Sequence, residues 1–143
     1  MGNDAHEADR LAARLSKRLA SIPLVVRDAA LVTVVKQAGA MADTMRRLVP
    51  VDEGDLRDSI TVTGPRGTTP KYSQPGGSST VPQNAAAITV GNSDVRYGHL
   101  VEYGTAKSPP QPFFWPAVRL HNKKASKAIK SAVSRAVREE WGK

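Results

Sequence analysis

The positions of proline set the strongest limit on what this chain can fold into, because proline ends or bends a helix. All ten prolines fall at position 23 or between positions 50 and 116. The stretches 24–49 and 117–143 therefore contain none, and apolar residues recur in both at the spacing of an amphipathic helix. The sequence predicts a long helix on each side of a proline-rich middle region.

The first long helix is expected over residues 24–48, between Pro23 and Pro50. The β-branched cluster at positions 32–35 leaves a kink or a local strand as the alternative. The stripe expected to face the core consists of Val34, Ala38, Met41, Ala42, Met45 and Leu48. A preceding helical extension over residues 1–23 has an apolar repeat of its own, formed by Leu11, Leu15, Leu19 and Ile22.

The last helix is expected over residues 116–141, with Pro116 in its first turn, where a missing N–H costs little. Basic residues fill the faces that are expected to be exposed, so this is a basic C-terminal helix. The apolar stripe that should pack inward consists of Ala125, Ile129, Ala132, Val133, Ala136 and Val137.

The middle region is expected to hold several short elements. A short helix is predicted from Asp52, as its N-cap, through Arg57. Alternating polar and apolar residues at 59–63 predict a half-buried strand, and residues 86–91 predict its antiparallel partner. Residues 97–103 are expected to form a third strand or a short helix–strand unit. The predicted architecture is a single α+β domain, in which the N- and C-terminal helices pack against a small antiparallel sheet.

A long loop joins the two predicted strands. Residues 64–82 hold four glycines and four prolines among 19 residues, a composition typical of an exposed and flexible loop. A loop of this length in a compact domain usually serves a function or is disordered. Gly54 and Gly104, on either side of this region, are expected at positive φ or at a close approach of two backbones.

Three of the seven aromatic residues stand together behind a rigid proline segment, at positions 113–115. One interpretation is that at least two of them fill the core of the monomer. The other is that one or two dock into an adjacent subunit, as aromatic hot-spot residues do. Arg57 is expected to pair with Glu102 or with a neighbouring chain. The candidate contacts between subunits are therefore Arg57, Glu102, Tyr103, Phe113, Phe114 and Trp115.

Positive charge is concentrated near the C-terminus. The chain has 21 Lys+Arg and 13 Asp+Glu, a formal net charge of +8, and residues 119–143 supply +6 of it with eight basic and two acidic residues. Lys123, Lys127 and Lys130 share one helix face. This stripe is either a solvated face or a surface that contacts DNA phosphates or an acidic partner, and Lys71 is a further candidate for such contact. Nothing in the sequence indicates base reading.

Several kinds of site are excluded or disfavoured. The chain has no cysteine, which excludes disulfides and thiolate chemistry. No apolar run approaches the ~20 residues of a membrane helix. The acidic residues at positions 52–58 are expected to cap a short helix rather than to bind a metal. A metal-dependent nuclease or hydrolase that uses His99 and Glu102 is the disfavoured alternative, so we expect no enzyme, catalytic residue, cofactor or metal.

Three segments together carry a family resemblance. They are PVDEGDLRDSI at residues 50–60, YGHLVEYGT at 97–105 and QPFFWPA at 111–117. In this order and spacing they resemble a family of tail components of long-tailed bacteriophages. Its members include neck, head–tail joining and tail-completion proteins, and the lambda minor tail protein Z is a distant relative. The resemblance covers roughly residues 24–141; Tyr103 stands where Phe is commoner, and the loop is longer than the family minimum.

The resemblance implies a structural virion protein that is assembled in the cytoplasm of a bacterial host. Its copies would form a ring of six or twelve at the neck, in contact with neighbouring neck or tail proteins and, without sequence preference, with packaged double-stranded DNA. The roles of adaptor, stopper, tail terminator and tail completion stay open, as do a phage, a prophage and a gene transfer agent as the particle. The alternative is a basic protein that binds DNA outside any particle.

Overall fold

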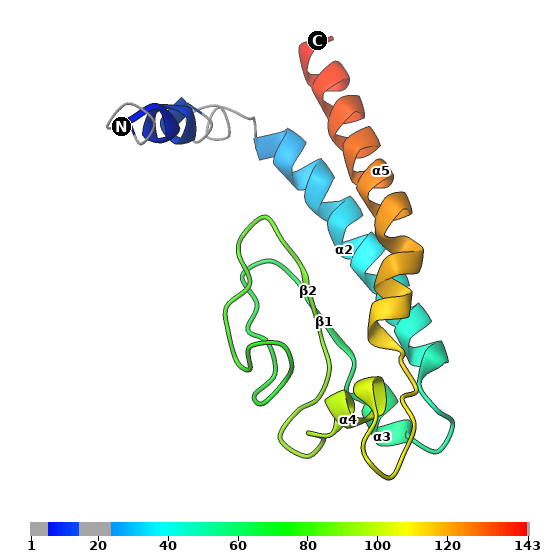
Figure 1. The fold of residues 1–143 in the computed structure, drawn as a ribbon. Coiled ribbons are helices and arrows are strands. Elements are labelled where there is room, and N and C mark those ends of the chain that lie inside the picture. Colours follow the sequence, from blue (N-terminus) through cyan, green and yellow to red (C-terminus); the bar gives the residue numbers. More distant parts are fainter. Residues whose placement is uncertain (1–5, 15–23, 143) are drawn as a thin grey trace.

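Two long antiparallel helices form the framework of the computed structural model, which describes residues 6–14 and 24–142 (Figure 1). α2 spans Leu24–Leu48 and α5 spans Phe114–Trp141, so at 1.5 Å per residue they are about 37 and 42 Å long. They pack side by side and make the most extensive contact between any two elements. Both helices that the prolines predict are therefore present, and α2 is helical through its β-branched cluster.

The smaller elements gather beside the lower half of this helix pair (Figure 1). They are α3 (Gly54–Asp58), β1 (Thr61–Thr63), β2 (Ala87–Thr89) and α4 (Gly98–Tyr103). The two strands are antiparallel, with Val62 opposite Ile88, and α2 packs against both strands. The predicted α+β architecture is confirmed, with strands shorter than the sequence pattern indicates.

Residues 6–14 are helical, as expected for the N-terminal extension. The rest of that extension, residues 1–5 and 15–23, lies outside the described residues, and so do Leu15, Leu19 and Ile22 of its predicted apolar repeat.

The core lies where the small elements meet the C-terminal half of α2 and the first turns of α5. Its buried members are Ala42, Met45, Val49, Leu56, Ile60, Val90, Val95, Phe113 and Ala117. Further along α5, Ala125 and Ala136 of the predicted stripe are also buried. The helical stripe on α2 ends differently from the prediction, because Leu48 is 44% exposed while Val49, just past the helix, is buried. The chain leaves the helix there, so the 3.6-residue periodicity no longer decides which side chain points inward.

Two predicted details of the turn after α2 are wrong. The N-cap of α3 is Glu53 rather than Asp52, and its side chain forms no capping hydrogen bond. The reason is a turn just before it, in which the Glu53 N–H donates to the carbonyl of Pro50 over 2.9 Å and delays the helix by one residue. Gly54 is the first residue of α3 and is not among the positive-φ glycines.

The glycine- and proline-rich segment 64–82 folds back on itself and on β2. Thr68 pairs with Thr80, and Gln74 pairs with Val90. Within this segment the side chains of Thr69, Ser73 and Val81 are buried, so the prediction of a solvent-exposed loop is wrong at these positions. Hydroxyl groups make the tight turns possible, because the Thr69 hydroxyl donates to the Gly77 carbonyl over 2.6 Å. The flexibility of the segment stays a prediction.

The element expected over residues 97–103 as a third strand or a short helix–strand unit is a short helix alone, α4, which presents Glu102 to the beginning of α5. Glu102 is 7% exposed, and its carboxylate accepts hydrogen bonds from the backbone N–H groups of Phe113, Phe114 and Trp115, over 2.7, 3.0 and 3.1 Å. These are three of the four N–H groups that a helix leaves unpaired at its N-terminus. The fourth belongs to position 116, where proline has no N–H. One side chain therefore satisfies every donor at this helix end.

A single glycine, Gly104, allows the chain between α4 and α5 to turn so closely that the Glu102 carboxylate reaches the start of α5. Gly104 ends α4 at φ = 78°, and a Cβ there would lie 2.7 Å from the backbone nitrogen of Pro110. The chain returns immediately, since the Gln111 N–H donates to the carbonyl of Val101 over 2.8 Å. The positive φ and close approach expected at Gly104 are confirmed.

We expect Glu102→Ala to lower the free energy of unfolding by about 3 kcal/mol, because it leaves buried N–H groups without an acceptor at a helix end. Glu102→Gln keeps one acceptor oxygen and should lose less. Chemical denaturation followed by circular dichroism measures both. Glu139→Ala, an exposed carboxylate at the other end of α5, is the matched control and should change stability by less than about 0.5 kcal/mol. A Glu102→Ala protein as stable as this control would contradict the capping role.

Candidate assembly interface

An exposed pair of aromatic side chains lies where α4 ends and α5 begins. The indole N–H of Trp115 donates to the hydroxyl of Tyr103 over 2.7 Å. Trp115 is 46% exposed and Tyr103 is 65% exposed. Behind them the Phe114 ring packs edge-on against the indole, with 5.1 Å between ring centroids. We call Tyr103 and Trp115 the aromatic pair.

A hollow of about 150 Å³ opens beside the aromatic pair. Four parts of the chain contribute to its wall, namely the 64–82 segment, Val90 just after β2, α4 and the start of α5. The lining residues are Gln74, Pro75, Val90, Gly98, His99, Glu102, Tyr103, Phe113, Phe114 and Trp115. Most of these surfaces are apolar, and the hollow is large enough for a few side-chain atoms of another protein rather than for a cofactor.

The backbone under the aromatic pair is fixed from inside. Glu102 and Trp115 are joined by one of the capping hydrogen bonds, and Tyr103 directly follows Glu102. Trp115 lies in the first turn of a 28-residue helix. The aromatic pair is therefore held in place before any partner arrives, which reduces the entropy that binding must overcome.

The three consecutive aromatic residues divide between core and surface. Phe113 is 1% exposed and belongs to the core, and Phe114 is half-buried against it. Phe113 therefore fills the monomer's own core, and Phe114 packs against that core while it also lines the hollow. Trp115 remains at the surface, so among the six predicted contact residues the exposed ones are Tyr103 and Trp115.

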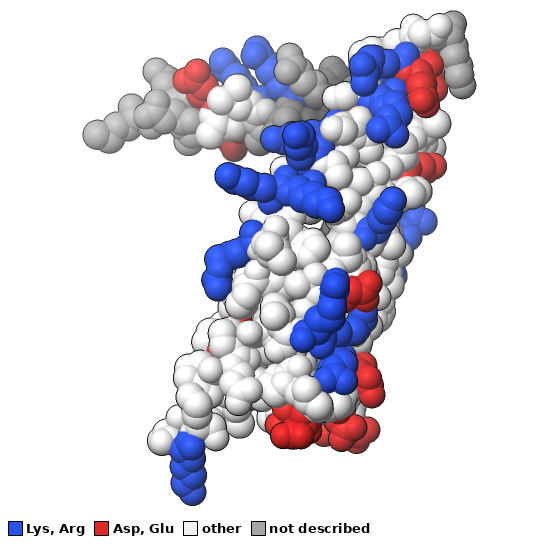
Figure 2. Space-filling model, turned by 90° about the vertical axis from the view of Figure 1, so that its right-hand side faces the viewer, with Lys and Arg blue, Asp and Glu red and all other residues white. Residues whose placement is uncertain are grey.

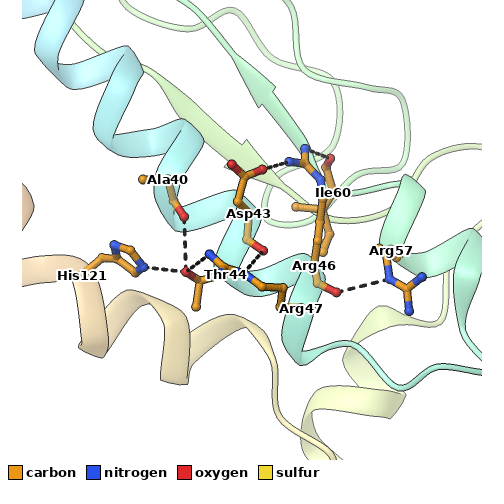
Figure 3. A network of polar contacts seen from close by, with 8 residues as sticks. All are labelled: Ala40, Asp43, Thr44, Arg46, Arg47, Arg57, Ile60 and His121. Carbon is orange, nitrogen blue, oxygen red and sulfur yellow. Dashed lines mark hydrogen bonds and ion pairs between the residues drawn. The ribbon is translucent and has the colours of Figure 1, made fainter.

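Arg57 does not pair with Glu102, which corrects one of the two expectations for it. Its Nε–H donates to the carbonyl of Arg46 over 3.2 Å, in the last turn of α2 (Figure 3). A cation is favourable there, because the C-terminal end of a helix carries partial negative charge. Glu102 faces the opposite kind of helix end, the N-terminus of α5, so the two side chains serve different helices.

Figure 3 shows that Arg57 belongs to a network that ties the end of α2 to its neighbours. The Arg46 guanidinium contacts the Asp43 carboxylate over 2.8 Å and donates to the carbonyl of Ile60 over 2.8 Å. Across the helix pair, Thr44 Oγ1 lies 2.6 Å from His121 Nε2, which links α2 to α5. These contacts join the end of α2 to α3, to Ile60 and to α5.

The basic residues lie apart from the aromatic pair. Lys123, Lys127 and Lys130 are exposed on α5, and Lys and Arg side chains are spread along the face in Figure 2, where acidic ones lie both at the lower end and near the upper end. Lys71 is exposed in the 64–82 segment, where its ammonium lies 5.5 Å from the centre of the Tyr72 ring. Lys71 and the α5 lysines come from separate parts of the fold.

Two kinds of site are not found among residues 6–14 and 24–142. No group of three or more His, Asp or Glu side chains there could hold a metal ion. No helix in that part of the chain is both long and apolar enough to span a membrane.

Sequence reasoning did not identify two parts of this site. The hydrogen bond between Tyr103 and Trp115 joins residues 12 positions apart, across a turn that the sequence pattern does not locate. Gln74 and Pro75 line the hollow although they belong to a segment that was expected to extend into solvent. The clusters of glycine and proline could only mark that segment as one that turns.

Comparison with known proteins gives one match. Residues 9–104, more than half of the chain, match the family described as "Bacteriophage HK97-gp10, putative tail-component". No curated protein and no solved structure matches. The matched range contains α2, both strands, α3 and α4, and it includes the first segment that carries the resemblance and all but the last residue of the second. The resemblance is thereby confirmed, and the chain belongs to the HK97 gp10-like family of bacteriophage tail components.

Proposed function

We propose that this tail component is a structural protein of the neck, whose copies assemble into a ring that joins head to tail or completes the tail. The observation that carries the proposal is the exposed aromatic pair, held rigidly beside an apolar hollow. Family membership supports a tail protein in general, and the site supplies a surface with which such a protein could bind copies of itself.

The chemistry of the surface suits a contact between proteins. Trp and Tyr are enriched at interface hot spots, where each buries a large area and still needs a partner for one polar atom. Here the indole N–H is already paired, because it donates to the phenol oxygen, and the phenol O–H stays free to donate to a partner. Burying the pair therefore removes apolar area from water without leaving the indole N–H unpaired.

A ring requires that two different surfaces of each copy meet, so that every subunit uses one surface toward each neighbour. The aromatic pair and hollow form one such surface. Buried Glu102 and Phe113 act on the ring indirectly, because they position the pair rather than contact a neighbour. Arg57, bonded to the end of α2, likewise supports the fold. The ring number stays at six or twelve, and rings of neighbouring neck or tail proteins are the further partners.

We expect Trp115→Ala to weaken self-association by about thirtyfold, the effect of removing a hot-spot residue worth about 2 kcal/mol. Sedimentation velocity over a range of protein concentrations measures it. Trp141→Ala is the matched control, since Trp141 is 78% exposed at the other end of α5. Thermal unfolding of both variants separates assembly from stability. Equal self-association of Trp115→Ala and Trp141→Ala, or a wild-type chain that stays monomeric at every concentration, would refute the proposed contact.

We expect particles produced with Trp115→Ala to accumulate as separate heads and tails, and particles with Trp141→Ala to be joined normally. Electron microscopy of the particles, with quantitative mass spectrometry for the chain, provides the measurement. Normally joined particles that lack the chain would contradict a neck role. That result, combined with tight duplex binding by the free protein, would instead favour the alternative of a DNA-binding protein that acts outside the particle.

A further inference from the structure

A long part of the chain carries no negative charge. From Tyr103 through Arg138 there is no Asp or Glu, and Glu139 is the next acidic residue after Glu102. The same stretch contains eight basic residues, which are Lys107, Arg119, Lys123, Lys124, Lys127, Lys130, Arg135 and Arg138. Most of them lie on α5.

Five of these basic side chains lie on one side of α5. At 100° per residue, positions 123, 127, 130, 135 and 138 fall within about 140° of one another, opposite buried Ala125 and Ala136. All five side chains are exposed. A shallow hollow of about 640 Å³ runs along this side. We call this side of α5 the basic face. It consists of Lys123, Ser126, Lys127, Lys130, Ser131, Ser134, Arg135 and Arg138.

The positive charge of the basic face is not neutralised within the part of the chain that the structure describes. The ion pair found there joins Arg46 to Asp43 on α2, and no acidic side chain pairs with a cation of the basic face. The three serines that alternate with these cations are exposed and add hydroxyl donors between them. A row of cations and hydroxyl groups is the set of donors that binds phosphate oxygens.

We propose that the basic face of α5 binds the sugar–phosphate backbone of duplex DNA without base specificity, at a surface separate from the aromatic pair. From Lys123 to Arg138 the helix rises about 22 Å, the length of about six base pairs at 3.4 Å each. Three to five phosphates lie within reach of five cations on that length. The face has no Asn, Gln or aromatic side chain from 123 to 138, so nothing on it could read base edges.

An acidic protein is the other polyanion that could cover this face, and the composition of the face disfavours it. Protein interfaces gain most of their affinity from buried aromatic or aliphatic anchors. The apolar side chains of this part of α5 point toward α2, and the basic face itself offers only cations and serines. Binding to a DNA backbone needs no apolar anchor, because affinity comes from the release of counterions.

The test measures fluorescence anisotropy of a labelled duplex of about 20 base pairs, titrated with the full chain at several salt concentrations from about 50 mM upward. Three to five phosphate contacts predict that the logarithm of the association constant falls with a slope of about −3 to −4.5 against the logarithm of salt concentration. Lys127→Gln/Lys130→Gln should weaken binding and reduce the steepness of this slope by about two. Binding should be independent of the duplex sequence.

The matched control is Lys36→Gln/Lys107→Gln, which removes the same charge from two exposed lysines outside α5. It should bind almost as the wild type does, and circular dichroism should show both variants folded. No binding at low salt, or equal losses in the two double variants, would overturn the proposal. Equally tight binding to polyglutamate would overturn it in favour of an acidic protein partner. The Trp115→Ala protein should bind DNA with the same dependence on salt concentration as the wild type. A loss of self-association therefore does not imply a loss of DNA binding, and the two proposals can fail separately.

Discussion

The Glu102 carboxylate accepts hydrogen bonds from the three backbone N–H groups at the start of α5, and these bonds decide how α4 and α5 are placed relative to each other. A buried carboxylate is costly to desolvate unless hydrogen bonds and opposite charge compensate for it. Here the compensation comes from a helix N-terminus, which supplies both donors and partial positive charge. These hydrogen bonds form only if Glu102 on α4 lies within hydrogen-bond distance of the first N–H groups of α5. The carboxylate therefore fixes the position of α4 relative to α5.

The contact between Glu102 and the start of α5 also explains how α5 can contribute to the core, the aromatic pair and the basic face. Its first turn is anchored by Glu102 and brings Phe113 into the core and Trp115 to the surface. Its apolar face packs against α2, and its remaining face carries cations at regular intervals. An amphipathic helix that is fixed at one end presents its outer face in a defined direction, so the aromatic pair and the basic face occupy separate and constant places on the molecule.

Much of the framework could be predicted because it depends on local signals. Proline marks both ends of α2, and periodicity identifies the apolar side of α5. The type of α4 could not be predicted, since six residues hold less than two helical turns of pattern. The cap could not be predicted either, because Glu102 and its donors are 11 to 13 residues apart and meet only after Gly104 reverses the chain. The turns of segment 64–82 depend on hydroxyl contacts such as that of Thr69 with Gly77, which leave no periodic signal.

The family match covers only part of the proposed surfaces, because Tyr103 and most of the hollow lie inside the matched range while Trp115 and the basic face lie beyond it. Leu56, Ile60 and Glu102, within the matched segments, are buried, and Arg57 bonds to the end of α2. The family match ends at Gly104, before the first residue of α5. The matched range therefore covers the elements against which α5 packs, while Trp115 and the basic face lie on α5 beyond its last residue. The match accordingly establishes a tail component, and the identity of what each copy contacts has to be read from α5.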